Sequence, residues 1–225
     1  KYGKSGTYAS YCGNMFRQTP YGIYKFIADG RVMVDPIGFS RKMPSYSTSR
    51  GLVDCEDVPE DLMFMCYPFV NGFSFTTKEW GEMYVSQLDD VKFDDGAFDY
   101  LVLDESIKQM VKALVVNSEG TFTDIIQKKS GGTIICLSGS PGVGKTLLTE
   151  SISELLHKPL YSIGCGELGT TVEKLELKLT EILEIAHKVA KIVLLQHSQH
   201  LLYVVCSVII VSISCLRKLY VFRLI

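Results

Sequence analysis

The chain has 225 residues, of which 47% are hydrophobic and 21% charged, and these values are typical of a globular protein rather than a disordered one. Its formal net charge is −2 and no basic stripe runs along it, so the composition gives no indication of nucleic-acid binding. The seven cysteines form no Cys-x-x-Cys pair. This odd number argues against a disulfide framework or a zinc ribbon, and favours the cytoplasm or another reducing intracellular compartment.

The first part of the chain, residues 1–95, is rich in Tyr, Phe and Gly and contains short alternating stretches, so we expect a small β-rich N-terminal domain. Residues 76–88 fit either a helix or a strand. The acidic stretch 89–96 has the composition of a linker. Short strands are predicted at residues 31–34, 63–67 and 72–75.

The second part, residues 96–195, alternates between apolar runs and amphipathic stretches. Asp104 is a good N-cap for a helix whose apolar face includes Ile107 and Val111. The alternation of strands and helices predicts an α/β domain with a parallel sheet and right-handed crossovers. The later elements are predicted as strands at 133–137, 159–163 and 192–195 and helices at 147–156 and 172–186.

Residues 139–146 read GSPGVGKT, which is the Gly-x-x-x-x-Gly-Lys-Thr pattern of a phosphate-binding loop. A β-branched apolar run precedes the loop and helical periodicity follows it, and this is the context in which the motif is specific. Lys145 would reach the β- and γ-phosphates, and the Thr146 hydroxyl would bind Mg²⁺. Glycines at three positions let the backbone N–H groups turn toward phosphate oxygens: Gly139, Gly142 and Gly144.

The order of these elements and their amino-acid sequences resemble those of an AAA+ ATPase. The form Pro-Gly-x-Gly-Lys-Thr at 141–146 is typical of that family, residues 98–103 resemble its linker, and residues 159–169 resemble its second strand and the loop beyond. Residues 30–39 and 72–82 also resemble the uncharacterised N-terminal region of fungal and giant-virus AAA+ proteins. Together the resemblance covers roughly residues 25–195, so the fold class is expected to be a partial P-loop NTPase (AAA+) α/β sheet after a β-rich domain.

The resemblance implies ATP and Mg²⁺ as cofactors, with Thr146 as the metal ligand. It also implies a homo-oligomeric ring in which ATP hydrolysis drives the remodelling of a protein substrate, and an arginine from the neighbouring subunit completes each site. The sequence does not identify that substrate. The phosphates would be bound by Gly139, Ser140, Pro141, Gly142, Val143, Gly144, Lys145, Thr146 and Leu147, and the adenine by Tyr100, Leu101 and Val102.

The chain departs from the family at the end of its third strand. The family has Asp-Glu there, the Asp orienting Mg²⁺ through water and the Glu activating the attacking water, whereas this chain has Gln196-His197. Phosphoryl transfer depends on positioning and electrostatics, so we assign no catalytic residue and expect ATP binding with little or no hydrolysis. The alternative is a non-catalytic subunit that senses nucleotide or assists assembly of an AAA+ ring.

The last segment, residues 196–225, contains no acidic residue, whereas all 25 acidic residues of the chain lie at or before Glu184. Three accounts of it stay open: a frameshift or retained intron, a membrane segment, or a genuine β-rich end to the domain. The uncharged run 201–216 is slightly short of the roughly 18–20 residues that span a bilayer. Because the chain begins with Lys1 rather than Met, we expect it to be a fragment, and without the last strands we expect an incomplete sheet.

Overall fold

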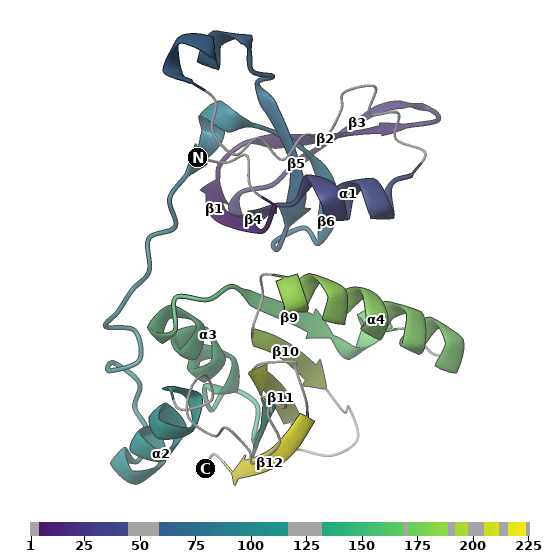
Figure 1. Ribbon diagram of the computed structural model, residues 1–225. Coiled ribbons are helices and arrows are strands. Elements are labelled where there is room, and N and C mark those ends of the chain that lie inside the picture. The colour runs from purple at the N-terminus through teal and green to yellow at the C-terminus, as the bar shows by residue number, and fades with distance from the viewer. Residues whose placement is uncertain are drawn as a thin grey trace, which may run out of the picture. The chain divides into compact units, whose positions relative to one another are not determined.

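The computed structural model forms two compact units, Lys1–Lys92 and Phe93–Ile225, which are described separately (Figure 1). The residues that the structure describes are 5–44, 59–116, 132–168, 171–188, 192–197, 205–211 and 216–223.

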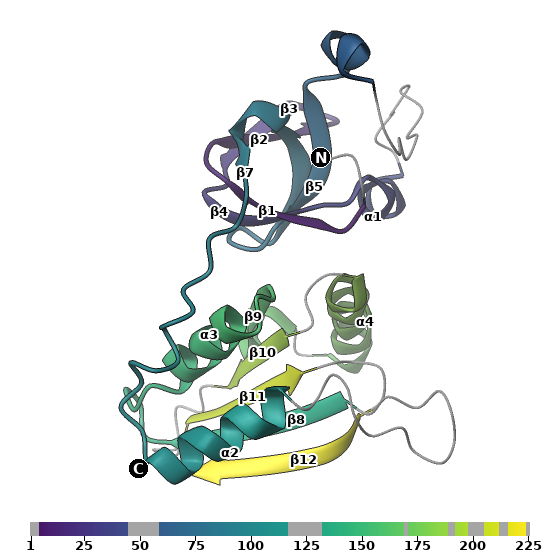
Figure 2. The ribbon, with the colours of Figure 1, turned by 60° about the vertical axis from the view of Figure 1, so that its left-hand side comes forward.

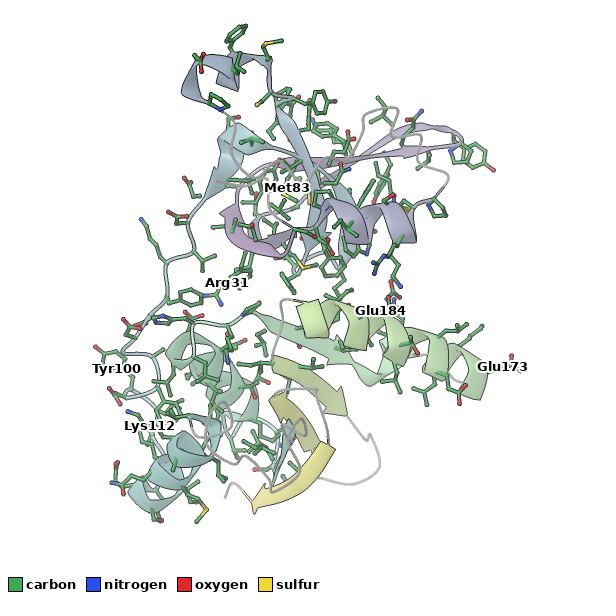
Figure 3. All side chains as sticks on the ribbon, in the orientation of Figure 1. Arg31, Met83, Tyr100, Lys112, Glu173 and Glu184 are labelled. Carbon is green, nitrogen blue, oxygen red and sulfur yellow. The ribbon has the colours of Figure 1, made fainter. Side chains whose placement is uncertain are left out.

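The first unit is built on a seven-stranded sheet in the order β3-β2-β6-β5-β4-β1-β7, with every neighbouring pair antiparallel. Its core is apolar and includes Met83, whose side chain is fully buried (Figure 3). The strands are β1 (Thr7–Tyr11), β2 (Asn14–Thr19), β3 (Gly22–Ile27), β4 (Gly30–Val34), β5 (Phe69–Ser74), β6 (Glu79–Tyr84) and β7 (Leu88–Asp89). The helical segments are α1 (Pro36–Lys42), η1 (Glu60–Met65) and η2 (Val85–Gln87).

The strands predicted at 31–34 and 72–75 are confirmed as parts of β4 and β5, and the ambiguous stretch 76–88 contains the strand β6. The strand predicted at 63–67 is wrong, because most of that stretch lies in the 3₁₀ helix η1. Prolines at 59 and 68 flank this segment and donate no backbone hydrogen bond to a ladder. Leu62, Phe64 and Met65 are exposed, so these described side chains give a strand no support from the core.

The second unit is an α/β domain whose five-stranded sheet has the order β12-β8-β11-β10-β9 (Figure 2). Its strands are β8 (Gly132–Gly139), β9 (Leu160–Gly164), β10 (Ile192–His197), β11 (Val205–Val211) and β12 (Leu216–Arg223). Its helices are α2 (Glu105–Val116), α3 (Lys145–Leu155), η4 (Cys165–Leu168) and α4 (Val172–Lys188). The helices and strands predicted between residues 104 and 195 are therefore confirmed, with small shifts at their ends.

Helices cover both faces of this sheet. On one face, α2 and α3 pack over β8 and β10 in a single apolar cluster that includes Val111, Ile152, Leu137 and Leu194. Val193 and Tyr161 are register partners on β10 and β9 and, by the alternation of strand side chains, point to the opposite face. Glu181 of α4 acts electrostatically on Tyr161, so α4 lies over that opposite face.

The sheet is mixed rather than wholly parallel, which corrects the sequence expectation. β9 and β10 are parallel and β12 is parallel to β8, but β11 is antiparallel to both β8 and β10. Only residues 198–204 connect β10 to β11, and a parallel arrangement needs a crossover of about a dozen residues or more. The general fold class, a partial P-loop NTPase α/β fold, is confirmed.

The end of the chain adds two strands to the sheet, β11 and β12, at residues where the sequence analysis predicted no strand. β11 inserts between β8 and β10, and β12 forms the edge beside β8. This backbone arrangement agrees with the third account of residues 196–225, a β-rich end to the domain. Across the described part of the chain, no helix combines the length and apolar character needed to cross a bilayer.

Candidate nucleotide-binding site

The phosphate-loop motif lies between β8 and α3, as its sequence context predicts. Gly142 and Gly144 have φ angles of 85° and 89°, in the left-handed region that favours glycine. A Cβ built on either residue would meet nothing within 4 Å, so the backbone angle rather than crowding within the chain requires glycine.

Lys145 is the first residue of α3, and its side chain is only 6% exposed. Its ammonium group donates hydrogen bonds to the Gly139 carbonyl at 3.1 Å and to the Ser140 carbonyl at 2.6 Å. The ammonium is therefore held inside the curve of the loop by the loop's own backbone. A phosphate that entered the loop would meet a positive charge already in place.

The first turn of α3 provides the rest of the phosphate environment. Its first intrahelical hydrogen bond runs from the Leu148 N–H to the Gly144 carbonyl at 2.8 Å. The N–H groups of a helix's first turn have no acceptor within the helix, and the helix dipole adds positive potential there. Thr146 and Leu147 are exposed, so the Thr146 hydroxyl is accessible to a metal ion bound with the phosphates. This environment suits a polyphosphate.

The linker residues expected to contact adenine fall into two groups. Leu101 is 9% exposed and belongs to the apolar cluster under α2 and α3, against which Val143 of the phosphate loop also packs. Tyr100 and Val102 are 82% and 100% exposed (Figure 3). Leu101 therefore anchors the linker, whereas Tyr100 and Val102 present side chains that a ligand can reach.

Polar contacts fix the linker against α2. Lys108 of α2 donates to the Asp99 carbonyl at 2.7 Å and to the Leu101 carbonyl at 3.4 Å. The Lys112 ammonium lies 6.0 Å from the centre of the Phe98 ring, which is itself buried in the core. These two lysines hold the segment that precedes α2.

Contacts at the end of α3 fix residues 93–95, which precede the linker 98–103. The Asp94 N–H donates to the Glu154 carboxylate at 3.0 Å, and His157 lies 2.5 Å from the Asp95 carboxylate. The His157 ring also stacks on Phe93, with ring centres 4.7 Å apart. Because α3 begins at the phosphate loop, the segment that leads into the linker contacts the same helix that carries the loop.

The end of β10, which is the strand predicted at 192–195, lies at the same end of the sheet as the phosphate loop. His197 is the last residue of β10 and pairs with Cys206 of β11, which in turn pairs with Ser138 of β8, next to Gly139. The backbones of β10 and β8 are thus two strand spacings apart, or about 10 Å. Gln196-His197 ends β10 here, where the sequence analysis expects the Asp-Glu pair of the family.

One acidic residue near this edge was missed by the sequence analysis. Glu167 lies on η4, directly after β9, and its carboxylate accepts a hydrogen bond from the Gly164 N–H at 3.2 Å. Gly164 is the register partner of Gln196. In the sequence, Glu167 is marked only by its position a few residues after the strand predicted at 159–163. Among the described residues, no group of three or more His, Cys, Asp or Glu side chains could hold a metal ion.

Tyr161 lies on β9, three residues before Gly164, and gives the unit an alkaline pH dependence. Burial, then the charges of Glu181 and Glu167, raise the pKa of Tyr161 from 10.0 to about 12. The folded state therefore binds more protons than the unfolded state between these values, so its stability falls as the pH rises from 10 to 12.

We expect Tyr161→Phe to remove this contribution to the pH dependence. Urea unfolding from pH 9 to 11.5 should show a shallower loss of stability in the variant, with a difference of at most about 1.4 kcal/mol per pH unit. Equal slopes in the wild type and the variant would show that the Tyr161 phenol titrates normally. The comparison concerns slopes, so a constant cost of removing the hydroxyl does not affect it.

The strand, the left-handed glycine loop and the helix that starts at a buried lysine have the arrangement expected of a phosphate-binding loop in an α/β domain. Residues 135–202 match the model of the family described as "ATPase family associated with various cellular activities (AAA)". These residues start within β8 and extend past β10. The match supports an AAA+ ATPase segment in the second unit.

Curated proteins that resemble the chain include Lon proteases and a Clp protease subunit. The chain is 39% identical over 75 residues to Lon protease of Chlamydia pneumoniae, covering 33% of this chain and 8% of that protein. It is 31% identical over 96 residues to the ATP-dependent Clp protease ATP-binding subunit ClpX of Bacteroides thetaiotaomicron, covering 39% of this chain and 22% of that protein. The chain thus spans less than a quarter of either relative. No solved structure gives a significant match.

These findings support an AAA+ ATPase in general terms. The family match lies entirely within the second unit. The resemblance of residues 30–39 and 72–82 to the N-terminal region of fungal and giant-virus proteins therefore stays a prediction.

Proposed function

We propose that the second unit binds ATP with Mg²⁺ at residues 139–147, and that this chain hydrolyses it slowly or not at all. The observation that carries the proposal is the buried Lys145 ammonium, held by two carbonyls inside a loop built on left-handed glycines. A buried cation of this kind is stabilised further by a bound anion. ATP is favoured because the ClpX relative is described as an ATP-binding subunit.

The residues of the site divide the work of binding. The loop N–H groups and the start of α3 would hold the phosphates, Lys145 would pair with the terminal phosphates, and Thr146 would ligate Mg²⁺. The metal would supply charge neutralisation on the phosphate oxygens. The exposed side chains of Tyr100 and Val102 would contact the adenine, while Leu101 keeps the linker in place.

Hydrolysis needs groups that this chain lacks at the end of β10. Gln196 carries no negative charge to orient the metal, and no carboxylate stands at position 197 to activate water. In the longer protein from which we infer this chain derives, ATP hydrolysis would be coupled to the remodelling of a protein substrate by a homo-oligomeric ring.

A second candidate function is a non-catalytic subunit that senses nucleotide or assists ring assembly. It requires residues 196–225 to be a folded part of the protein, and the pairing of β11 with both β8 and β10 supports this. Limited proteolysis distinguishes the possibilities. Resistance through the C-terminus favours the second candidate, whereas rapid cleavage near residue 195 counts against it.

Titration of the full chain with a fluorescent ATP analogue in the presence of Mg²⁺ tests the proposed function. We expect saturable binding of one nucleotide per chain, competed by ATP and weakened by EDTA. Saturable binding that GTP competes as well as ATP does would contradict the assignment of ATP, and the absence of binding would contradict the site.

The same titration separates the roles of two neighbouring linker residues. We expect Tyr100→Ala to weaken ATP binding about three- to tenfold with little effect on stability, because the ring is exposed but available for stacking. Leu101→Ala should instead lower the free energy of unfolding by about 2–4 kcal/mol, because it removes buried contacts. Equal affinities of wild type and Tyr100→Ala would remove the linker from the site.

A further inference from the structure

The β2–β3 hairpin is an exposed edge of the first unit. Among the described residues, β3 is the last strand of its sheet and pairs with β2 alone, and β2 meets β6 through one register pair, Phe16 and Glu82. Figure 1 shows the hairpin extending from the rest of the unit. In an antiparallel pair, alternate residues direct their N–H and C=O groups away from the partner, so β3 presents unpaired backbone groups at its outer edge.

This edge also carries apolar side chains in solvent. Ile23 is 76% exposed and Ile27 is 67% exposed, and Tyr21 in the hairpin turn is fully exposed. Lys25 is the one charged residue of β3. Side chains alternate between the two faces of a strand, so Ile23, Lys25 and Ile27 lie on the same face of β3. That face therefore has a basic residue between two apolar residues.

We propose that β3 binds an extended segment of a partner protein as an added strand, and that this segment has an acidic residue between two apolar residues at alternate positions. Strand addition gives affinity through main-chain hydrogen bonds and specificity through alternate side chains. The hairpin, residues 14–27, contains Arg17 and Lys25 and no acidic residue, so its charge complements an acidic segment. The proposal does not depend on nucleotide binding by the second unit.

The cations of the hairpin are held in defined positions. The Lys25 ammonium lies 6.0 Å from the centre of the Phe16 ring on the facing strand. Arg17 lies 5.2 Å from the centre of the Tyr24 ring and 3.8 Å from the Glu79 carboxylate. Lys25 is therefore the cation left to face an added strand, since the Arg17 charge already has an acidic neighbour.

A second copy of this chain fits the edge poorly. If two copies paired through β3 about a two-fold axis, residues opposite one another would lie on the same face of the sheet. Residues on one face are an even number of positions apart, so the numbers of two opposite residues would add up to an even number. The register that matches Ile23 with Ile27 places Lys25 opposite Lys25, and like charges directly opposite one another are destabilising. The adjacent register, centred on Tyr24, places Lys25 opposite Ile23. An acidic residue opposite Lys25 removes this conflict.

Binding of two fluorescent peptides to the full chain tests the proposal by anisotropy. In the Glu peptide, the residues Val, Glu and Val occupy alternate positions and Thr occupies the positions between them. The control Lys peptide is identical except that Lys replaces Glu. We expect the Glu peptide to bind about three- to tenfold more tightly, in line with the modest energies of cross-strand charge pairs. Lys25→Glu should reverse this preference, which a merely structural role of Lys25 would not do.

Two further measurements keep the test decisive. Lys25→Gln, for use if the charge reversal disturbs folding in thermal melts, should bind both peptides with equal affinity. Sedimentation of the wild type should show no concentration-dependent dimer. If a dimer forms, Ile23→Asp tests whether it uses the β3 edge, because the variant would then abolish it. Such a dimer would overturn the proposal in favour of a second copy. Failure of the Glu peptide to bind the wild type, or equal binding of the two peptides by the wild type, would also overturn it.

Discussion

Lys145→Ala is expected to weaken ATP binding by roughly 10- to 150-fold. The ammonium is buried in the phosphate loop and is held 2.6–3.1 Å from the carbonyl oxygens of Ser140 and Gly139. A hydrogen bond to a charged group contributes about 1.5–3 kcal/mol, and 1.4 kcal/mol corresponds to a factor of ten in affinity. Isothermal titration calorimetry with Mg²⁺ and ATP measures the change directly.

The matched control is Lys174→Ala, which removes an exposed lysine from α4. It should bind ATP like the wild type. Thermal melts of both variants should establish that the loop and its helix remain folded. If folded Lys145→Ala binds ATP within about twofold of the wild type, the phosphate loop is not the binding site.

Restoring two acidic residues at the end of β10 should create ATP hydrolysis. We expect the double variant Gln196→Asp and His197→Glu to raise the turnover rate at least about tenfold, while ATP affinity changes only a few-fold. The register places this strand end at the same end of the sheet as the phosphate loop, two strands away, and a positioned general base contributes about 10²–10⁴ to a rate. Phosphate release at saturating ATP provides the measurement.

A neutral double variant, Gln196→Asn and His197→Gln, separates charge from a change of side chain at these positions. It should leave turnover at the wild-type level. If the acidic variant binds ATP yet gains no turnover, the strand end does not hold the missing catalytic groups.

The elements of the second unit follow closely from local patterns in the sequence. The phosphate loop was predictable because it depends on glycines, a lysine and a threonine at fixed spacing between a strand and a helix. The helix after Asp104 was predictable for a similar reason, since its Asp104 side chain accepts a hydrogen bond from the Ser106 N–H at 3.1 Å.

Features that depend on contacts distant in sequence were not predictable. The direction of β11 follows from its pairing with β8 and β10 and from the short connection before it. The burial of Leu101 between exposed neighbours follows from packing under α2 and α3. The position of Glu167 beside Gly164 likewise required the fold, because one Glu after a strand carries no pattern of its own.

At Glu60–Met65 the sequence predicts a strand that the structure does not contain, because the segment is a 3₁₀ helix. An apolar run predicts a strand only if a neighbouring strand is available to pair with it, and this depends on the rest of the sheet. Here β5 begins after Pro68, and the preceding apolar side chains stay exposed. A short apolar run alone does not distinguish these cases.

Simultaneous measurement of ATP binding and phosphate release by the full chain tests the central claim most directly. The structure and sequence predict one ATP bound per chain in the presence of Mg²⁺, with phosphate release no faster than in buffer. Mg²⁺-dependent turnover that Lys145→Ala abolishes would contradict the assignment of a binder without catalysis, and the absence of ATP binding would contradict the site itself.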